Sequence, residues 1–342
     1  MEKEDTIQKT NTEEQVFYSK DQVREIMKRR VERTHNAFFS RYSVKNLAEL
    51  DRVVELGYKY KGIIEKPEVD SSGKFTFSLN ELIGLKQIKS KIERLAALII
   101  KNSKLPFRQS MNYVFLGNPG TGKTVAARAL AEVFFEKGII KENKVIEADR
   151  STLVAEYLGQ TAPKVKKVFT EALGGVLFID EAYLLTAAKN DSTDYCHEVL
   201  MVLNKMMEDH RGELVVILAG YQEETLKMLN GNRGLKSRIN SYFRFKDYTY
   251  DELKQILNVL ATKYQYKLEG DVQDKIIRII QRKNDRVEYG NARDLRNILE
   301  GTMEYQAVRT SDEPWNRTIT MEDLLEWQIE NGVVLESDIT EA

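Results

Sequence analysis

Apolar positions divide the chain into a helical start, a middle that alternates strands with helices, and a helical end. Near the start, apolar residues recur three or four positions apart, which predicts two helices. They are Val23, Ile26, Met27 and Val31 in the first and Leu47, Leu50 and Val54 in the second. The turn-rich stretch 67–73 predicts a linker. Residues 1–75 are therefore predicted to form an N-terminal helical extension with its linker.

The middle of the chain alternates short apolar runs with helical patterns. Predicted strands cover 113–116, 145–148, 176–180, 214–219 and 242–245, and predicted helices cover 88–99 and 125–137. Strands this apolar are expected when both faces of a sheet are covered. Their alternation with helices favours a parallel sheet. We therefore expect an α/β domain over 76–247, with a parallel five-stranded sheet and helices on both faces.

The last part of the chain changes character. Residues 249–252 read Thr-Tyr-Asp-Glu, which is typical of a helix start. Helical patterns follow over 253–260, 272–280 and 292–305, and we find no strand alternation there. Residues 248–342 are predicted to form a separate helical domain.

Composition narrows the class of protein only a little. With 52 basic and 53 acidic residues in 342, the net charge is −1, so there is no clear nucleic-acid signature. The longest apolar runs are too short for a membrane span, and the charged N-terminus does not resemble a signal peptide. The single cysteine, Cys196, fits a reducing compartment, and the expectation is a cytoplasmic protein.

A glycine-rich loop between a predicted strand and a predicted helix carries the strongest signal. It reads Gly117, Asn118, Pro119, Gly120, Thr121, Gly122, Lys123 and Thr124, and it matches G-x-x-x-x-G-K-[ST]. In such a loop the backbone N–H groups surround phosphate oxygens, the lysine reaches the β and γ phosphates, and the Ser/Thr hydroxyl ligates Mg²⁺. The loop predicts ATP and Mg²⁺ as ligands.

Two acids end the third predicted strand. Asp180 is placed to hold Mg²⁺ together with Thr124, and Glu181 is placed to polarise the attacking water. Many strands end at an acidic helix cap, so this pair indicates a catalytic site only in combination with the phosphate loop. A second carboxylate supplies a base that a binding-only switch does not need. The pair therefore predicts an ATPase.

At these motifs the chain resembles an AAA+ ATPase, and in particular the family that contains the red-type Rubisco activase and stage V sporulation protein K. The resemblance covers about residues 78–310 and rests on 81–85, 117–124, 156–162, 177–183, 217–221 and 290–293. It implies a P-loop AAA+ domain, a C-terminal helical lid and a homo-hexameric ring. A role in sporulation is one expectation that comes with it.

The resemblance also implies roles for further residues. Ile83, Gly84 and Leu85 fall where the family cradles adenine, although Leu85 alone is equally consistent with ordinary core. The stretch Tyr157, Leu158 and Gly159 matches the central pore loop, whose aromatic residue grips a polypeptide. Taken without the family, a tyrosine is more often part of the core.

Two arginines complete the implied site. Arg238 matches the arginine finger that reaches a neighbouring subunit's nucleotide, with Arg233 as a second candidate. Arg293 matches the phosphate-contacting arginine of the lid, with Arg296 as the alternative. Many family members carry a polar sensor, commonly Asn, after the fourth strand, where this chain reads Ala-Gly-Tyr at 219–221. The residue that orients the water is therefore not identified from the sequence.

The function that follows is an ATP-hydrolysing ring motor that remodels a protein substrate through its pore loop. Two alternatives stay open: a nucleic-acid-associated motor or loader, and a nucleotide-gated scaffold. The near-neutral charge weighs against the first. Nothing in residues 1–75 identifies a substrate.

Overall fold

The computed structural model describes residues 78–104, 109–155, 159–186, 195–283, 290–311, 313 and 316–333. Among them, one compact unit contains 78–260 and 280–296, and a second contains 261–279 and 297–333. The predicted helices of the N-terminal extension lie outside the described residues. The boundary at 247/248 stays a prediction, since the compact units do not follow chain order.

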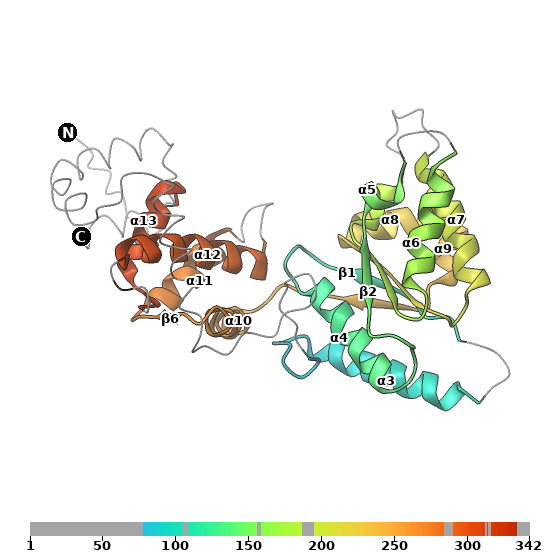
Figure 1. Cartoon of the computed structure of the whole chain (residues 1–342), viewed down its shortest axis with the longest axis horizontal. Helices are drawn as coiled ribbons and strands as arrows, with labels where there is room; N and C mark the ends of the chain where they lie inside the picture. Colours follow the sequence, from blue (N-terminus) through green and yellow to red (C-terminus); the bar gives the residue numbers. More distant parts are fainter. Residues whose placement is uncertain are drawn as a thin grey trace, which may run out of the picture. The chain divides into compact units, whose positions relative to one another are not determined.

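The first unit is built on a parallel five-stranded sheet (Figure 1). Its strands are β1 (Asn112–Leu116), β2 (Val145–Ala148), β3 (Val176–Ile179), β4 (Val215–Gly220) and β5 (Ser241–Arg244). Their order across the sheet is β2-β3-β4-β1-β5. Strand β1 pairs with both β4 and β5, so Leu116 lies opposite Gly220 on one side and Arg244 on the other. The predicted parallel sheet and its five strands are confirmed, and no strand end differs from its prediction by more than one residue.

Helices cover both faces of this sheet because its central strands are apolar on both sides. Tyr113 and Phe115 of β1 point into one apolar cluster, with α3 (Lys86–Asn102) and α4 (Lys123–Glu136). Val114 and Leu116 point into the other. That second cluster is completed by α5 (Arg150–Leu153), α6 (Thr161–Ala172), α7 (Tyr195–Asp209), α8 (Gln222–Gly231) and α9 (Arg233–Arg238).

The C-terminal part of the chain is mainly helical. Its helices are α10 (Tyr250–Lys263), α11 (Val272–Lys283), α12 (Ala292–Arg309) and α13 (Met321–Glu330). Within the second unit, Arg309 makes two hydrogen bonds to the buried Asp323 carboxylate, at 2.7 and 2.9 Å. Asp323 also caps α13 through Thr320, so one carboxylate ties two helices together.

The expectation of no strands after residue 249 is wrong. Strands β6 (Lys267–Leu268) and β7 (Thr318–Ile319) form a short parallel pair, and α13 was also missed. Each of these strands is two residues long, which is too short to show alternation of apolar and polar positions. In the part of the chain that the structure describes, no helix is both long and apolar enough to cross a membrane.

Candidate functional site

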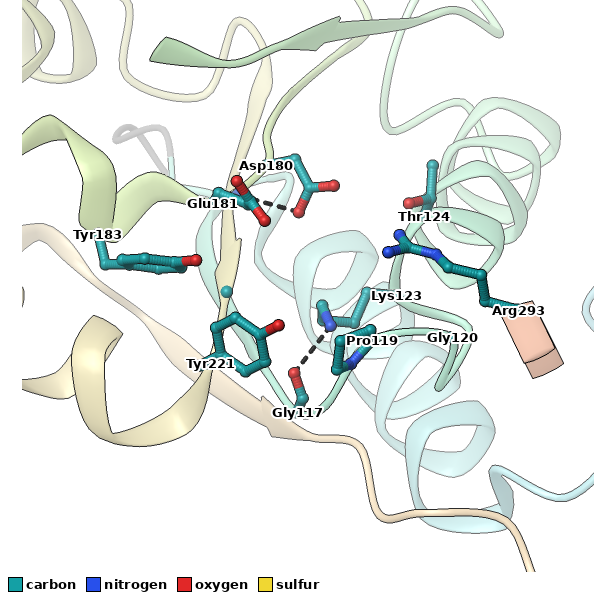
Figure 2. A pocket seen from close by; sticks show the side chains of 11 residues that line it. Gly117, Pro119, Gly120, Lys123, Thr124, Asp180, Glu181, Tyr183, Tyr221 and Arg293 are labelled. Carbon is teal, nitrogen blue, oxygen red and sulfur yellow. Dashed lines mark hydrogen bonds between the residues drawn. The ribbon is translucent and has the colours of Figure 1, made fainter. Parts of the chain in front are cut away.

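A pocket opens where the carboxyl ends of β1, β3 and β4 meet the start of α4, within the first compact unit (Figure 2). Ligands bind at this edge in open α/β sheets. Its lining residues are Gly117, Pro119, Gly120, Lys123, Thr124, Asp180, Glu181, Tyr183, Gly220, Tyr221 and Arg293. The structure thus brings together the phosphate loop, both acids and the lid arginine that the sequence predicted far apart in the chain.

The glycine loop is shaped to expose backbone donors. Gly122 precedes α4 without any side-chain cap, which leaves N–H groups at the helix start available to an anion. Lys123 Nζ donates to the carbonyl oxygens of Gly117 and Asn118, at 2.8 Å each. Burial lowers the pKa of Lys123, because buried surroundings disfavour its charged form, while Asp180 opposes that shift. The loop therefore places the Lys123 side chain beside the N–H groups at the start of α4.

Glu181 has an unusual backbone conformation. Its φ is 46° and its ψ 41°, in the left-handed region that costs a non-glycine residue about 1–2 kcal/mol. Its N–H donates to Asp180 Oδ1 at 3.0 Å. Asp180 is held by β3, whose last residue pairs with β4. Both acids line the pocket (Figure 2), and such strain in a pocket is characteristic of functional positions.

The donors fit Mg²⁺. Thr124 supplies a hydroxyl and Asp180 a carboxylate to the same pocket. Mg²⁺ is usually held by one or two carboxylates plus substrate phosphates, so a full cage of protein ligands is not required. The described residues indeed contain no cluster of three or more His, Cys, Asp or Glu side chains able to hold a metal by themselves.

The predicted adenine residues lie beside the glycine loop. Gly84 and Leu85 both have positive φ, 61° and 52°, which turns the chain into α3. A Cβ added at Gly122 would lie 3.4 Å from Leu85 Cδ1 and 2.7 Å from the hydroxyl of Tyr248. Burial raises the pKa of Tyr248. Tyr248, which sequence reasoning missed, therefore lies beside the glycine loop, as Leu85 does. Ile83, two residues before Leu85, is half-buried.

Asn291 is a second residue that sequence reasoning missed. It is fully buried with φ 51°, and its Nδ2 donates to Asp247 Oδ1 at 2.8 Å and to Pro119 O at 3.2 Å. Its Oδ1 accepts from the Tyr248 N–H at 3.1 Å. Asn118 donates to the same Asp247 carboxylate at 3.0 Å. We call Asp247 and Asn291 the polar clamp, because they join the glycine loop to the start of α12.

We expect Asn291→Gly to lower the free energy of unfolding by about 2 kcal/mol, because it leaves the partly buried Pro119 carbonyl oxygen and Tyr248 N–H without this partner. Glycine tolerates the positive φ, so backbone strain does not contribute. Thermal and denaturant unfolding measure the loss. Asn118→Ala removes only an exposed bond to Asp247, and about 0.5 kcal/mol is expected. Equal losses in the two variants would contradict a central role for Asn291.

The four arginines are placed differently. Arg293, exposed at the start of α12, lines the pocket, whereas Arg296 is not among the lining residues. Arg238, at the end of α9, also lies outside that lining. Its Nη1 donates to Gly234 O at 2.9 Å, and its Nε lies 3.3 Å from a Glu208 carboxylate oxygen. Arg233 is exposed at the start of the same helix.

The predicted pore loop is described only at its base. Tyr157 and Leu158 lie outside the described residues, and Gly159 follows them with φ 78°. Lys164, which follows the loop in α6, donates to the carbonyl oxygens of Ser151 and Val154, which precede the loop, at 2.7 and 2.8 Å. These bonds join α5 to α6 on either side of the loop.

The fold and site define the class of protein. The family model described as "ATPase family associated with various cellular activities (AAA)" matches residues 113–246, and an AAA lid domain matches 249–332. The chain therefore belongs to the AAA ATPases and is an ATPase.

Within that class, the chain belongs to the red-type Rubisco activase family. It is 38% identical over 257 residues to the chloroplastic ribulose bisphosphate carboxylase/oxygenase activase of Cyanidioschyzon merolae, covering 73% of this chain and 87% of that protein. It is 36% identical over 258 residues to the chromosomal protein CbxX of Cupriavidus necator, covering 72% and 81%. These names give no support to the expected role in sporulation.

The fold also resembles solved structures. A mutant RuvB from Thermotoga maritima superposes with a TM-score of 0.52 at 20% identity, covering 73% of this chain and 71% of that one. At this identity the likeness concerns the fold alone.

Proposed function

We propose that this ATPase is a homo-hexameric ring motor that uses ATP hydrolysis to remodel a protein substrate. The observation that carries the proposal is that residues of the glycine loop, Asp180, Glu181 and Arg293 line one and the same pocket. Membership of the red-type Rubisco activase family supports a protein substrate. The relatives' name makes ribulose bisphosphate carboxylase/oxygenase the first protein to test.

In this proposal the glycine loop and Lys123 bind the β and γ phosphates. Thr124 and Asp180 hold Mg²⁺, which neutralises charge that develops on the phosphates. Glu181 accepts the proton of the attacking water, since its carboxylate lines the pocket at the end of β3. Arg293 contacts the phosphates of the nucleotide that is bound to its own chain. Leu85 and Tyr248, with Ile83 and Gly84, hold the adenine.

The hexamer is proposed from the placement of Arg238. It sits outside its own chain's pocket, and an arginine that stabilises transition-state charge can be supplied by a second subunit. Its contacts with Gly234 and Glu208 hold the guanidinium at the end of α9. Arg233 stays the second candidate.

Tyr157→Ala is expected to leave basal ATP hydrolysis within about twofold and to abolish remodelling, because it removes the proposed gripping aromatic and leaves Lys123, Asp180 and Glu181 unchanged. Tyr157→Phe, which keeps the ring, is expected to retain remodelling. Reactivation of inhibited ribulose bisphosphate carboxylase/oxygenase provides one readout, and ATP turnover provides the other. Unchanged remodelling by Tyr157→Ala would overturn the pore-loop assignment.

The same assay separates the alternatives. Stimulation of ATP turnover by DNA or RNA, falling steeply with salt, would favour a nucleic-acid motor. Slow hydrolysis that no partner stimulates, together with ATP-dependent assembly, would favour a scaffold.

A further inference from the structure

The carboxyl end of β4 lies at the centre of the pocket. Strand β4 pairs with β3, which the two acids follow, and with β1, which leads into the glycine loop. The Gly117 N–H donates to Gly220 O at 3.2 Å, so the end of β4 is tied directly to that loop. Gly220 and Tyr221 at this end of β4 line the pocket together with the two acids and the glycine loop.

No side chain can enter at Gly220 itself. A Cβ at this position would lie 2.6 Å from Thr225 Oγ1 and 2.8 Å from Cδ1 of the Tyr183 ring. Ala219, the preceding residue, is fully buried in the sheet core and carries only a methyl group. A polar group at the end of β4 must therefore come from the next residue, Tyr221.

Tyr221 fills that position together with Tyr183. Both line the pocket, and their ring centroids lie 5.7 Å apart with the planes tilted by 52°. Their hydroxyl groups point into the pocket, and that of Tyr221 points toward the side that holds Lys123 (Figure 2). The two rings arrive from different elements, one after β4 and one from the short 3₁₀ helix η2 (Ala182–Leu185) that follows the acids.

The chemistry of a phenol suits hydrogen-bond donation to a phosphate at neutral pH. An ordinary tyrosine side chain has a pKa of about 10, so its hydroxyl keeps its proton at neutral pH. A protonated phenol both donates and accepts. Loss of a single preorganised donor aimed at developing transition-state charge typically lowers kcat by about 100-fold or more.

We propose that Tyr221 is a catalytic residue of the ATPase, whose hydroxyl donates a hydrogen bond to the transferred γ-phosphoryl group. Tyr183 is a positioning residue: its ring occupies the space that a side chain at Gly220 would need and packs against the ring of Tyr221. This inference rests on the proposed roles of Lys123 and Glu181 in the same pocket.

Tyr221→Phe tests the proposal, because it removes the hydroxyl and keeps the ring. We expect kcat for ATP to fall by about 100-fold, with KM and ATP affinity changed by less than about threefold. Tyr242→Phe is the matched control, since it also removes one hydroxyl while keeping its ring, at a half-buried residue of β5 outside the pocket lining. A change of less than about threefold in kcat is expected for it.

A structural role gives a different pattern. If Tyr221 only packs, Tyr221→Phe keeps full kcat, and that result overturns the proposal, as would a rise in KM at unchanged kcat. Thermal unfolding and ATP binding of each variant establish that it is folded. Glu181→Gln, measured in parallel, distinguishes failure of this inference from failure of the proposed function. If Glu181→Gln loses hydrolysis and Tyr221→Phe retains it, the role of Tyr221 is refuted while the proposed ATPase site stands.

Discussion

Glu181→Gln is expected to lower ATP turnover by about 10³-fold while ATP stays bound. The substitution keeps the size and the pocket position of the side chain, but an amide cannot accept the proton of the attacking water. Lys123, Thr124 and Asp180 are unchanged, so the proposed phosphate and Mg²⁺ contacts remain. A single-turnover assay measures hydrolysis, and retention of labelled ATP after gel filtration measures binding.

Glu223→Gln is the control for this experiment. It makes the same chemical change on an exposed residue in the first turn of α8, outside the lining of the pocket. Its turnover is expected to stay within about twofold of the unaltered protein. Full hydrolysis by Glu181→Gln would remove Glu181 from the role of base, and weakened ATP binding would indicate that its carboxylate acts earlier.

Gly120→Ala is expected to abolish ATP binding and to destabilise the chain by about 3 kcal/mol. A Cβ there would lie 1.9 Å from the carbonyl oxygen of Gly290 and 2.8 Å from the Arg293 nitrogen. Both neighbours are backbone atoms, so no side chain can rotate away. The Ala292 N–H also donates to Gly120 O at 3.3 Å, which holds the two segments together. Relief of the clash must separate the glycine loop from the start of α12.

Gly138→Ala is a matched control because Gly138 has the same φ, 66°, and nothing within 4 Å of an added Cβ. It carries the cost of a left-handed alanine without the clash, about 1–2 kcal/mol. The difference between the two variants in denaturant unfolding therefore isolates the contact between the glycine loop and α12. Equal losses, with ATP binding intact in Gly120→Ala, would show that this contact is not needed.

The residues that sequence reasoning missed share one property. The sequence placed Tyr221 and Asn291 in motifs but gave neither of them, nor Tyr248, a role, because each contacts a partner that is distant in sequence. Asn291 reaches Pro119 and Asp247 only because α12 begins beside the glycine loop. A positive φ at a non-glycine residue, as at Glu181 and Leu85, is likewise invisible in a single sequence.

The sequence by itself determined the parallel α/β class, the five strands, the glycine loop and the two acids after the third strand. These follow from local patterns, since apolar runs and glycine spacing act over a few residues. Only the tertiary structure decided which residues share the pocket. It placed Arg293 in the lining and Arg238 outside it, and it paired Tyr183 with Tyr221 across Gly220. The physical reason is that packing and strand order, which no local pattern encodes, bring the ends of β1, β3 and β4 together.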